Sequence, residues 1–332
     1  MTITITLTAD ADTGAGVDFN AGYEAYFDGF TPFELPLFLG PTSDETTQII
    51  HLDTPVSGQE SATRAVLVEG SDFAYTFSDH TVSGTIDTIR LTTLGAAYDT
   101  ASGDLVLDDG VVTAATEFIT ISGLDLSNAP HVRGDVHNLI RGLMGGGPDG
   151  TSADASVLTT TIWSQGHDLR GSTGGDTYDG SSFADRVRGN GGNDTLFGGS
   201  GNDRIQGGGG RDVLGGDLGR DVLEGGAGRD DFVYLLASDS TVAAAGRDRI
   251  VDFVSGVDDI DLRRMDADIR DADIDSFVWR DTRAFNGTAG ALHWRATAAG
   301  VLVEADLDGD RDADFAILLA GTDSLQRSDF LL

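Results

Sequence analysis

The chain has 332 residues, enough for two or three domains, and carries a formal net charge of −34. Such an acidic surface repels phosphate backbones and anionic lipid, which argues against nucleic-acid binding and membrane insertion. The sequence contains no cysteine, so disulfide bonds and thiol chemistry are excluded. Its first ten residues lack a basic region followed by an apolar one, so we expect no N-terminal signal peptide.

Residues 1–166 are patterned as an α+β domain. Apolar and polar residues alternate over 2–8, which predicts a strand, and residues 16–30 predict a short helix. Residues 104–121 are typical of a hairpin that turns at Asp109-Gly110. Further strand-like runs lie at 64–68, 73–77 and 81–92.

Two helices are predicted after these strands. Residues 131–144 place Val132, Val136, Leu139, Ile140 and Leu143 on one face, and Gly145–Gly147 end the helix. A second helix is predicted from about residue 153 to 163, with Ser152 as its cap. Strands followed by helices predict a curved antiparallel sheet with helices on one face.

A nine-residue repeat dominates residues 167–233. A glycine lies five residues before each repeated aspartate, and an apolar residue lies two after it. The seven aspartates are Asp176, Asp185, Asp194, Asp203, Asp212, Asp221 and Asp230. The glycines permit tight turns, and the apolar residue of a short strand needs a stacked neighbour to be buried. A flexible linker would not explain the apolar positions.

This pattern is the G-G-x-G-x-D-x-U-x nonapeptide of calcium-binding parallel β-rolls of the RTX type. Stacking brings aspartate carboxylates and loop carbonyls together, and calcium prefers six to eight such oxygens. We therefore expect the seven aspartates to hold several Ca²⁺ ions. The first two units are irregular, with Phe183 in place of a loop glycine, so their calcium sites should be poorer.

Residues 234–332 return to strand-like patterning and are predicted to cap the roll, whose last turn would otherwise expose an open edge. Five alternating aspartates begin at Asp306. They do not form an EF-hand, because glycine stands at the fourth position and Ile317 at the twelfth. We interpret them as an acidic hairpin turn with weak affinity for calcium.

Residues 171–332 resemble the C-terminal calcium-binding domain of the serralysin metallopeptidases. The resemblance rests on the nonapeptides, on GRDRIVDFVSGVDDIDL (246–262) and on ADLDGDRDADFAILLAG (305–321). The last four residues, 329–332, resemble the C-terminal signal of type I secretion substrates, which implies a secreted, extracellular protein and the type I machinery as a partner. None of the six histidines lies in an H-E-x-x-H motif, so the peptidase is missing.

Residues 72–91 (DFAYTFSDHTVSGTIDTIRL) resemble the haem-ligand region of the HasA family of secreted haemophores. Residues 121–147 resemble the late loop and helix of that family, with His137 at a matching position. The resemblance implies that the Tyr75 phenolate binds the iron of haem b and that His80 hydrogen-bonds the phenolate. It also implies haem or a haem-carrying protein, and an outer-membrane receptor, as partners.

The sequence departs from the HasA pattern at the second iron ligand. Residues 27–40 contain no histidine, and His51 is the nearest one. The resemblance then implies binding through Tyr75 alone. The apolar side chains expected to cover the porphyrin face are Phe30, Phe33, Leu35, Leu37 and Phe38.

A tyrosine on a strand is more often a core residue with a bonded hydroxyl, and this reading stands beside the haem reading. We interpret His131 and His137 as structural, and His167 and His293 as solvated. The sequence therefore predicts a secreted, calcium-stabilised haem-binding protein without enzymatic activity. The alternative is a secreted calcium-dependent adhesin or surface-layer-type protein whose N-terminal domain binds a protein or glycan.

Overall fold

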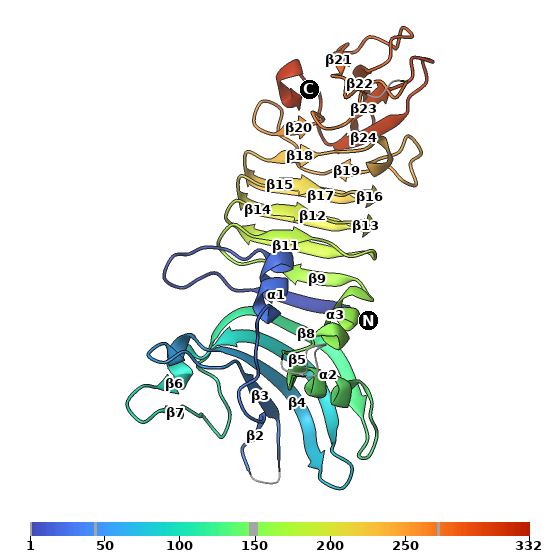
Figure 1. The fold of residues 1–332 in the computed structure, drawn as a ribbon. Helices are drawn as coiled ribbons and strands as arrows, with labels where there is room; N and C mark the ends of the chain where they lie inside the picture. Colours follow the sequence, from blue (N-terminus) through green and yellow to red (C-terminus); the bar gives the residue numbers. More distant parts are fainter. Residues whose placement is uncertain (1, 43–44, 146–151, 271–272) are drawn as a thin grey trace. The chain divides into compact units, whose positions relative to one another are not determined.

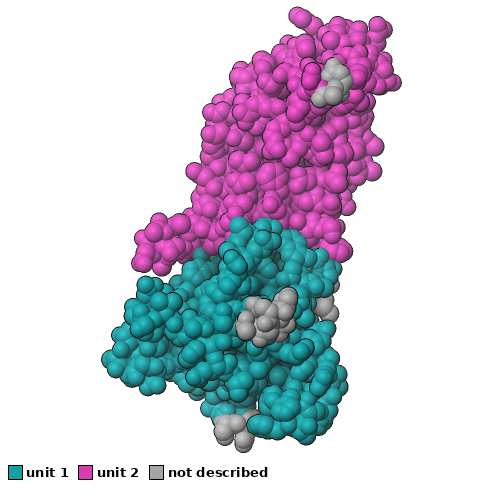
Figure 2. All heavy atoms as spheres, viewed as in Figure 1, with its two compact units in different colours: residues 1–8, 19–165 teal, residues 9–18, 166–332 magenta. Residues whose placement is uncertain are grey.

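The computed structural model describes residues 2–42, 45–145, 152–270 and 273–332. These residues form two compact units, coloured separately in Figure 2. Unit 1 consists of residues 1–8 and 19–165, and unit 2 of residues 9–18 and 166–332. The assignment of Ala9–Asp18 to unit 2 was not predicted from the sequence. The predicted division at 166 and 233 into three domains stays a prediction.

Unit 1 is built on a six-stranded sheet with the order β2-β3-β4-β5-β8-β1, in which each neighbouring pair is antiparallel (Figure 1). The strands are β1 (Ile3–Leu7), β2 (Leu37–Leu39), β3 (Gln48–Leu52), β4 (Arg64–Thr76), β5 (Thr81–Thr93) and β8 (Thr116–Asn128). Ile3, Ile5 and Leu7 are buried while Thr4 and Thr6 are less so, which confirms the alternation predicted for the first strand.

Two predictions about these strands need correction. The runs 64–68 and 73–77 are one strand, β4, whose pairing with β5 shifts between Glu69 and Gly70. The hairpin predicted over 104–121 is wrong: β7 (Asp104–Leu105) pairs with β6 (Tyr98–Asp99), and β8 pairs with β5 and β1. Only a local turn forms at Asp109-Gly110, because both residues adopt positive φ.

The described residues of unit 1 form three α-helices, α1 (Phe19–Phe27), α2 (Asp135–Leu143) and α3 (Ser156–Trp163). α2 packs on β5, β8 and α3 through the predicted apolar face, except that Val132 precedes the helix and is exposed. α3 starts later than predicted and Ser152 does not cap it; the Asp154 carboxylate accepts the N–H of Ser156 at 2.9 Å instead. Of the predicted glycine terminator of α2, only Gly145 lies within the described residues.

Unit 2 is a parallel β-roll in which successive repeats alternate between two sheets (Figure 1). One sheet contains β9 (His167–Arg170), β11 (Arg186–Gly191), β14 (Arg204–Gly210), β17 (Val222–Gly228) and β19 (Arg249–Ile250). The other contains β10 (Thr177–Asp179), β12 (Thr195–Phe197), β15 (Val213–Gly215), β18 (Asp231–Val233), β20 (Asp259–Asp261) and β25 (Phe330–Leu331). A small pair joins β13 (Ser200–Gly201) and β16 (Leu218–Gly219).

The apolar residue of every repeat points into the roll and is fully buried. The set, 0% exposed throughout, is Tyr178, Val187, Leu196, Ile205, Leu214, Leu223 and Phe232. Each such side chain loses its contact with water only because the next turn of the same sheet covers it. The nine-residue spacing of apolar residues therefore builds one continuous core.

The C-terminal residues extend both sheets of the roll. β19 pairs in parallel with β24 (Phe315–Ala320), and an antiparallel series β24-β23-β22 follows. The series contains β23 (Gly300–Asp306) and β22 (Ala291–Thr297), and β21 (Val278–Trp279) pairs in parallel with β22. Short 3₁₀ turns are η1 (Glu60–Ala62), η2 (Gly95–Ala97), η3 (Ala237–Asp239) and η4 (Arg327–Asp329). Among the described residues, no helix is both long and apolar enough to cross a membrane.

Candidate functional sites

The first candidate site lies at the turn between β4 and β5 in unit 1. Tyr75 is near the end of β4, and His80 closes the turn with a φ of 56°, a left-handed conformation uncommon outside glycine. The hydroxyl of Tyr75 lies 2.5 Å from Nδ1 of His80, a short hydrogen bond. The structure thus brings together the two residues that the sequence singled out.

Two hollows meet at this pair. An apolar hollow of about 390 Å³ is lined by Leu35, Pro36, Phe38, Tyr75, Phe77, His80, Val82 and Met144. A polar hollow of about 600 Å³ is lined by Tyr75, His80, Val82, Arg133, His137, Asn138, Arg141 and Met144. Phe77 and Leu35 are 82% and 74% exposed, so the apolar hollow has a water-facing rim. Exposed apolar side chains gathered around one hollow are a feature of ligand-binding sites.

Only some of the apolar side chains predicted to cover a porphyrin line the apolar hollow. Leu35 and Phe38 line the apolar hollow, but Phe30 is fully buried elsewhere, beside Tyr26 and Arg64. Prediction of Phe30 as a covering residue is therefore wrong, because it belongs to the core. Phe33 and Leu37 are exposed, and the hollow's lining does not include them.

Two other histidines of unit 1 hydrogen-bond to neighbouring protein groups. Nδ1 of His131 lies 2.7 Å from the carboxylate of Asp79, and Nδ1 of His137 accepts the N–H of Val82 at 3.3 Å. Burial and the nearby arginines lower the pKa of His137. His51 is buried in β3, where burial lowers its pKa to about 3, and it lines neither hollow.

The second candidate site is the row of aspartates in the roll. Each repeat aspartate after Asp176 accepts at Oδ1 the main-chain N–H of the residue 18 positions earlier, which holds the aspartate position two repeats before it. Asp203, for example, accepts the N–H of Asp185 at 2.7 Å, and Asp212 that of Asp194 at 2.9 Å. We call the residues joined in this way the ladder residues. Alternate repeats share a sheet, so the step along the ladder is 18 residues.

The ladder contains members that the sequence analysis missed. His167 occupies its first position and donates its N–H to Asp185 at 2.6 Å. Asp248 and Asp258 accept from Asp221 and Asp230 at 2.8 and 3.1 Å. These two aspartates follow their donors by 27 and 28 residues in place of 18, so they fall outside the nine-residue repeat. An aspartate two residues before a buried isoleucine, as at Asp248 and Asp258, was the signal that could have found them.

Six ladder carboxylates carry a buried oxygen without a hydrogen-bond partner among the described residues. The atoms are Oδ2 of Asp194, Asp203, Asp212, Asp221, Asp230 and Asp248. Burial raises the pKa of Asp194 to about 7, of Asp203 to about 8 and of Asp248 to about 9. A desolvated carboxylate disfavours its charge unless a cation compensates it. Unshared carboxylate oxygens are also the ligands that calcium prefers, so these residues fit the ion.

The glycine five residues before each aspartate has a steric reason. A Cβ at Gly198 would lie 2.4 Å from Oδ2 of Asp203, and the equivalent atom at Gly207 would lie 2.3 Å from Oδ2 of Asp212. Neither glycine adopts a positive φ, whereas the next residue in the chain, Gly199, has φ 87°. One glycine leaves room for the carboxylate, and the following one makes the turn.

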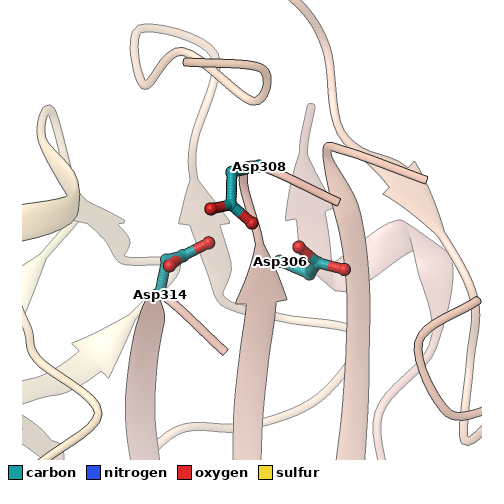
Figure 3. A group of neighbouring side chains, drawn as sticks. All are labelled: Asp306, Asp308 and Asp314. Atoms are coloured by element: carbon teal, nitrogen blue, oxygen red, sulfur yellow. The ribbon is translucent and has the colours of Figure 1, made fainter. Parts of the chain in front are cut away.

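The third candidate site is a cluster of aspartates in the hairpin between β23 and β24. The carboxylates of Asp306, Asp308 and Asp314 converge, with one oxygen from each within 4.8 Å of the others (Figure 3). Asp306 accepts the N–H groups of Gly309 and Arg311 at 2.7 and 3.1 Å, so its two oxygens already have donors. The weak calcium affinity predicted for this turn stays a prediction.

Two histidines predicted to be solvated are not. His167 is fully buried, and its Nδ1 lies 2.7 Å from the hydroxyl of Tyr178. His293 is largely buried, with Nε2 3.5 Å from the carboxylate of Glu304. The predictions failed because both residues lie on strands, β9 and β22, whose neighbours cover them.

Two arginines on the outside of the roll pair with carboxylates. Arg211 contacts Asp231 at 2.6 Å, and Arg229 contacts Asp259. Both arginines remain more than half exposed, so these pairs contribute little to stability.

Comparisons with known proteins match the two halves of the chain to different families. Residues 53–195 match the model of heme-binding protein A (HasA), which covers less than half of the chain. Residues 153–332 match the model of the peptidase M10 serralysin C-terminal domain. The two matches overlap over 153–195, across the predicted boundary at 166. The search of curated proteins found no match.

Solved structures similar to this chain include representatives of both kinds of domain. The chain is 23% identical to the apo haemophore HasA from Yersinia pestis, covering 48% of this chain and 87% of that one, with a TM-score of 0.32. It is 28% identical to the AlgE6R2 subunit of the Azotobacter vinelandii mannuronan C5-epimerase, covering 48% and 93%, with a TM-score of 0.34. Because the serralysin model spans more than half of the sequence, the chain belongs to the serralysin C-terminal domain family.

Proposed function

We propose that this protein is a secreted, calcium-stabilised haem-binding protein in which the phenolate of Tyr75 binds the iron. The observation that carries the proposal is the 2.5 Å contact between the Tyr75 hydroxyl and Nδ1 of His80, at the edge of an exposed apolar hollow. The HasA match over residues 53–195 supports it. Haem bound here supplies a ferric iron that accepts an anionic oxygen ligand.

His80 prepares the tyrosine for this role. A free tyrosine has a pKa of about 10, so the phenolate is scarce at neutral pH. Nδ1 of His80 accepts the phenolic proton along the existing hydrogen bond and, once protonated, donates a hydrogen bond back to the phenolate oxygen. A partner of this kind fixes the orientation of the ligand and tunes its basicity.

The two hollows suit the two chemistries of a haem. Leu35, Phe38 and Phe77 offer apolar surface to a porphyrin face. On the other side of the pair, Arg133 and Arg141 line the polar hollow, where guanidinium groups favour carboxylates such as propionates. The proposed cargo is therefore haem, taken up free or from a haem-carrying protein and passed to an outer-membrane receptor.

Calcium has a structural role in the proposal. The ladder aspartates with an unpartnered Oδ2 would hold the ions together with loop carbonyls. Calcium supplies the positive charge that lets these buried carboxylates ionise, so its binding energy becomes folding energy. A calcium-poor cytoplasm leaves the roll unfolded for the type I machinery, and calcium outside the cell folds it. We propose binding, without catalysis, as the activity of this chain.

The haem site is tested by titrating ferric haem into the full chain and recording the Soret and charge-transfer bands. The parent protein should give a tyrosinate charge-transfer band, and Tyr75→Phe should lose it. Tyr98→Phe is the matched control, since Tyr98 lies in β6 and lines neither hollow. A parent without any Soret change would overturn the haem proposal and favour an adhesive protein that binds a protein or glycan.

A further inference from the structure

The carboxylates of the ladder aspartates fall into two groups, those with hydrogen-bond donors on both oxygens and those with a donor on Oδ1 alone. Six of them leave a buried Oδ2 without a protein donor among the described residues, as set out above. Asp176 and Asp185, the first two aspartates of the repeat, have protein donors on both oxygens. The difference separates the first two turns from those that follow.

Asp185 is held by four donors. Its Oδ1 accepts the N–H of His167 at 2.6 Å and the hydroxyl of Ser181 at 2.9 Å. Its Oδ2 accepts the N–H of Ser181 at 2.7 Å and, more weakly, the Tyr178 hydroxyl at 3.4 Å. That hydroxyl also contacts Nδ1 of His167 at 2.7 Å. His167, Tyr178 and Ser181 are all buried, so their contacts are shielded from water.

Asp176 is held in the same manner by Ser172. The Ser172 N–H reaches Oδ2 at 2.6 Å, and its hydroxyl reaches Oδ1 at 3.0 Å. The ladder donor comes from far away in the sequence: the N–H of Val17 reaches Oδ1 at 2.6 Å. The N–H of Thr177 donates to the carbonyl of Val17 at 3.0 Å. The N–H of Thr195 donates in the same way to the carbonyl of Asp176 at 2.8 Å.

Val17 therefore takes the place of a repeat that the sequence does not contain. It belongs to Ala9–Asp18, the segment that clusters with unit 2. Asp18 forms a parallel bridge with Thr177, which extends the sheet of β10 by one position. The β10 edge of the roll is thus covered by residues 17 and 18 of this segment.

The sequence explains why only the first two turns are closed in this way. Serine stands four residues before the aspartate in these two units alone. The later units have Asn190, Gly199, Gly208, Asp217 and Gly226 at that position, none of which carries a hydroxyl. At the far end of the ladder, Asp258 has an N–H donor on Oδ2, from Val254 at 2.8 Å, without any hydroxyl.

We propose that the first two turns of the roll close without calcium and form a seed on which the calcium-dependent turns assemble. The seed consists of residues 9–18 and 167–187, held by Val17, Ser172, Ser181 and the His167–Tyr178 pair. This inference rests on the proposed calcium-dependent folding of the roll. It replaces the expectation of two poor calcium sites with two sites that need no ion.

The energetics follow from the donors. Several N–H and O–H bonds satisfy the oxygens of a buried carboxylate without a cation, because charge-assisted hydrogen bonds are the strongest of their kind. In a stacked array each turn is stabilised by its neighbour, so a preformed first turn removes the cost of starting the array. Calcium then has only to extend the roll.

Hydrogen exchange read by mass spectrometry on the full chain, with excess chelator and with calcium, tests the proposal. Peptides from residues 167–187 should be protected in both conditions. Peptides from 194–250 should exchange rapidly in chelator and become protected on adding calcium. Equal, rapid exchange of both regions in chelator would overturn the seed and leave calcium-dependent folding intact. Equal protection of both regions in chelator would overturn calcium-dependent folding itself.

Two variants sharpen the test. The double variant Ser172→Ala and Ser181→Ala removes both hydroxyl donors and should speed exchange of the seed in chelator by at least about tenfold. Tyr178→Phe keeps the buried ring, removes its hydroxyl and should act in the same direction. Ser200→Ala is the matched control, because the described contacts of that serine do not include a hydroxyl bond to a ladder aspartate. Unchanged seed protection in the double variant would overturn the role of the serines.

Discussion

His80 is held in an uncommon main-chain conformation, with φ 56° at a residue that is not glycine. Such conformations cost of order 1–3 kcal/mol and persist where the surroundings fix them. The neighbouring Asp79 supplies that fixation, since it accepts the Thr81 hydroxyl at 2.8 Å and contacts His131 at 2.7 Å. The turn therefore keeps His80 in a position from which Nδ1 reaches Tyr75.

Removal of the His80 ring should weaken haem binding without abolishing it. In His80→Ala the phenolate of Tyr75 loses its hydrogen-bond partner, and such partners typically contribute about 10- to 100-fold to metal affinity. Ferric-haem affinity, measured by Soret titration at neutral pH, should fall by about that factor. The loss should shrink at pH above about 10, where tyrosine ionises unaided.

His131→Ala is the control for this prediction. His131 lies in the same unit and contacts Asp79, but it lines neither hollow. Since Asp79 keeps its bond to Thr81, we expect this variant to lose less haem affinity than His80→Ala. Equal affinities for His80→Ala and the parent would show that the tyrosine needs no partner.

Gly198 gives a second prediction at the scale of one residue. A Cβ there would lie 2.4 Å from Oδ2 of Asp203, so Gly198→Ala should displace that carboxylate and weaken one calcium site. Gly209→Ala is the matched control, because its Cβ would meet nothing closer than 3.9 Å. Calcium titration followed by circular dichroism should show a higher midpoint for Gly198→Ala only. Identical midpoints for the two variants would mean that Asp203 is not a ligand.

Strands β22 and β23 pair His293 with Glu304 directly, and Arg295 contacts the same carboxylate at 2.7 Å. Burial opposes ionisation of Glu304, but the bonds from His293 and Arg295 outweigh it and hold its pKa at about 2. The folded pKa lies below the unfolded value, so the stability it contributes is present above about pH 4.3 and lost as the pH falls towards 2.

Glu304→Gln should therefore lower Tm at pH 6, and its difference from the parent should shrink below about pH 4. Thermal unfolding in saturating calcium at pH 6 and pH 3.5 measures the two differences. Glu224→Gln is the control, since the pair of Glu224 with Arg204 is exposed and should change Tm little at either pH. A difference that is constant with pH would contradict the assigned pKa.

The elements that sequence reasoning found are those with a local cause. The aspartate–apolar spacing predicted the roll strands, because burial of the apolar residue depends only on neighbouring turns. The hairpin predicted at Asp109-Gly110 failed, because the turn is local but the pairing of β8 with β5 and β1 is not. Asp248 and Asp258 were missed for a similar reason, since longer loops precede them.

The candidate sites divide in the same way. Tyr75 and His80 are five residues apart across a hairpin turn, so their contact was within reach of the sequence. The N–H of Val17 on Asp176 joins residues 159 positions apart and could not be foreseen. The same holds for Arg133 and Arg141 beside Tyr75, because helix α2 and its preceding loop reach the hollow only through the tertiary fold.

The residues of the proposed haem site and the ladder aspartates lie in different units. Tyr75 and His80 belong to unit 1, whose core comes from the antiparallel sheet and its helices, and the aspartates belong to unit 2. Each unit buries its own apolar residues, so each has its own source of stability. Calcium binding therefore acts on the unit that carries no proposed haem ligand.

From this separation we expect haem binding to survive the removal of calcium. With excess chelator, the full chain should keep its Soret and charge-transfer bands and a haem affinity within about threefold of that in calcium, a free-energy change below about 0.7 kcal/mol. Circular dichroism of the same samples should show the loss of β structure from unit 2. Tyr75→Phe in both conditions controls for non-specific haem. Disappearance of the charge-transfer band on chelation would show that the two units fold as one. The connection would be the seed segment 9–18, which runs directly into α1. Unfolding of the roll would then spread through this segment to the haem-binding unit.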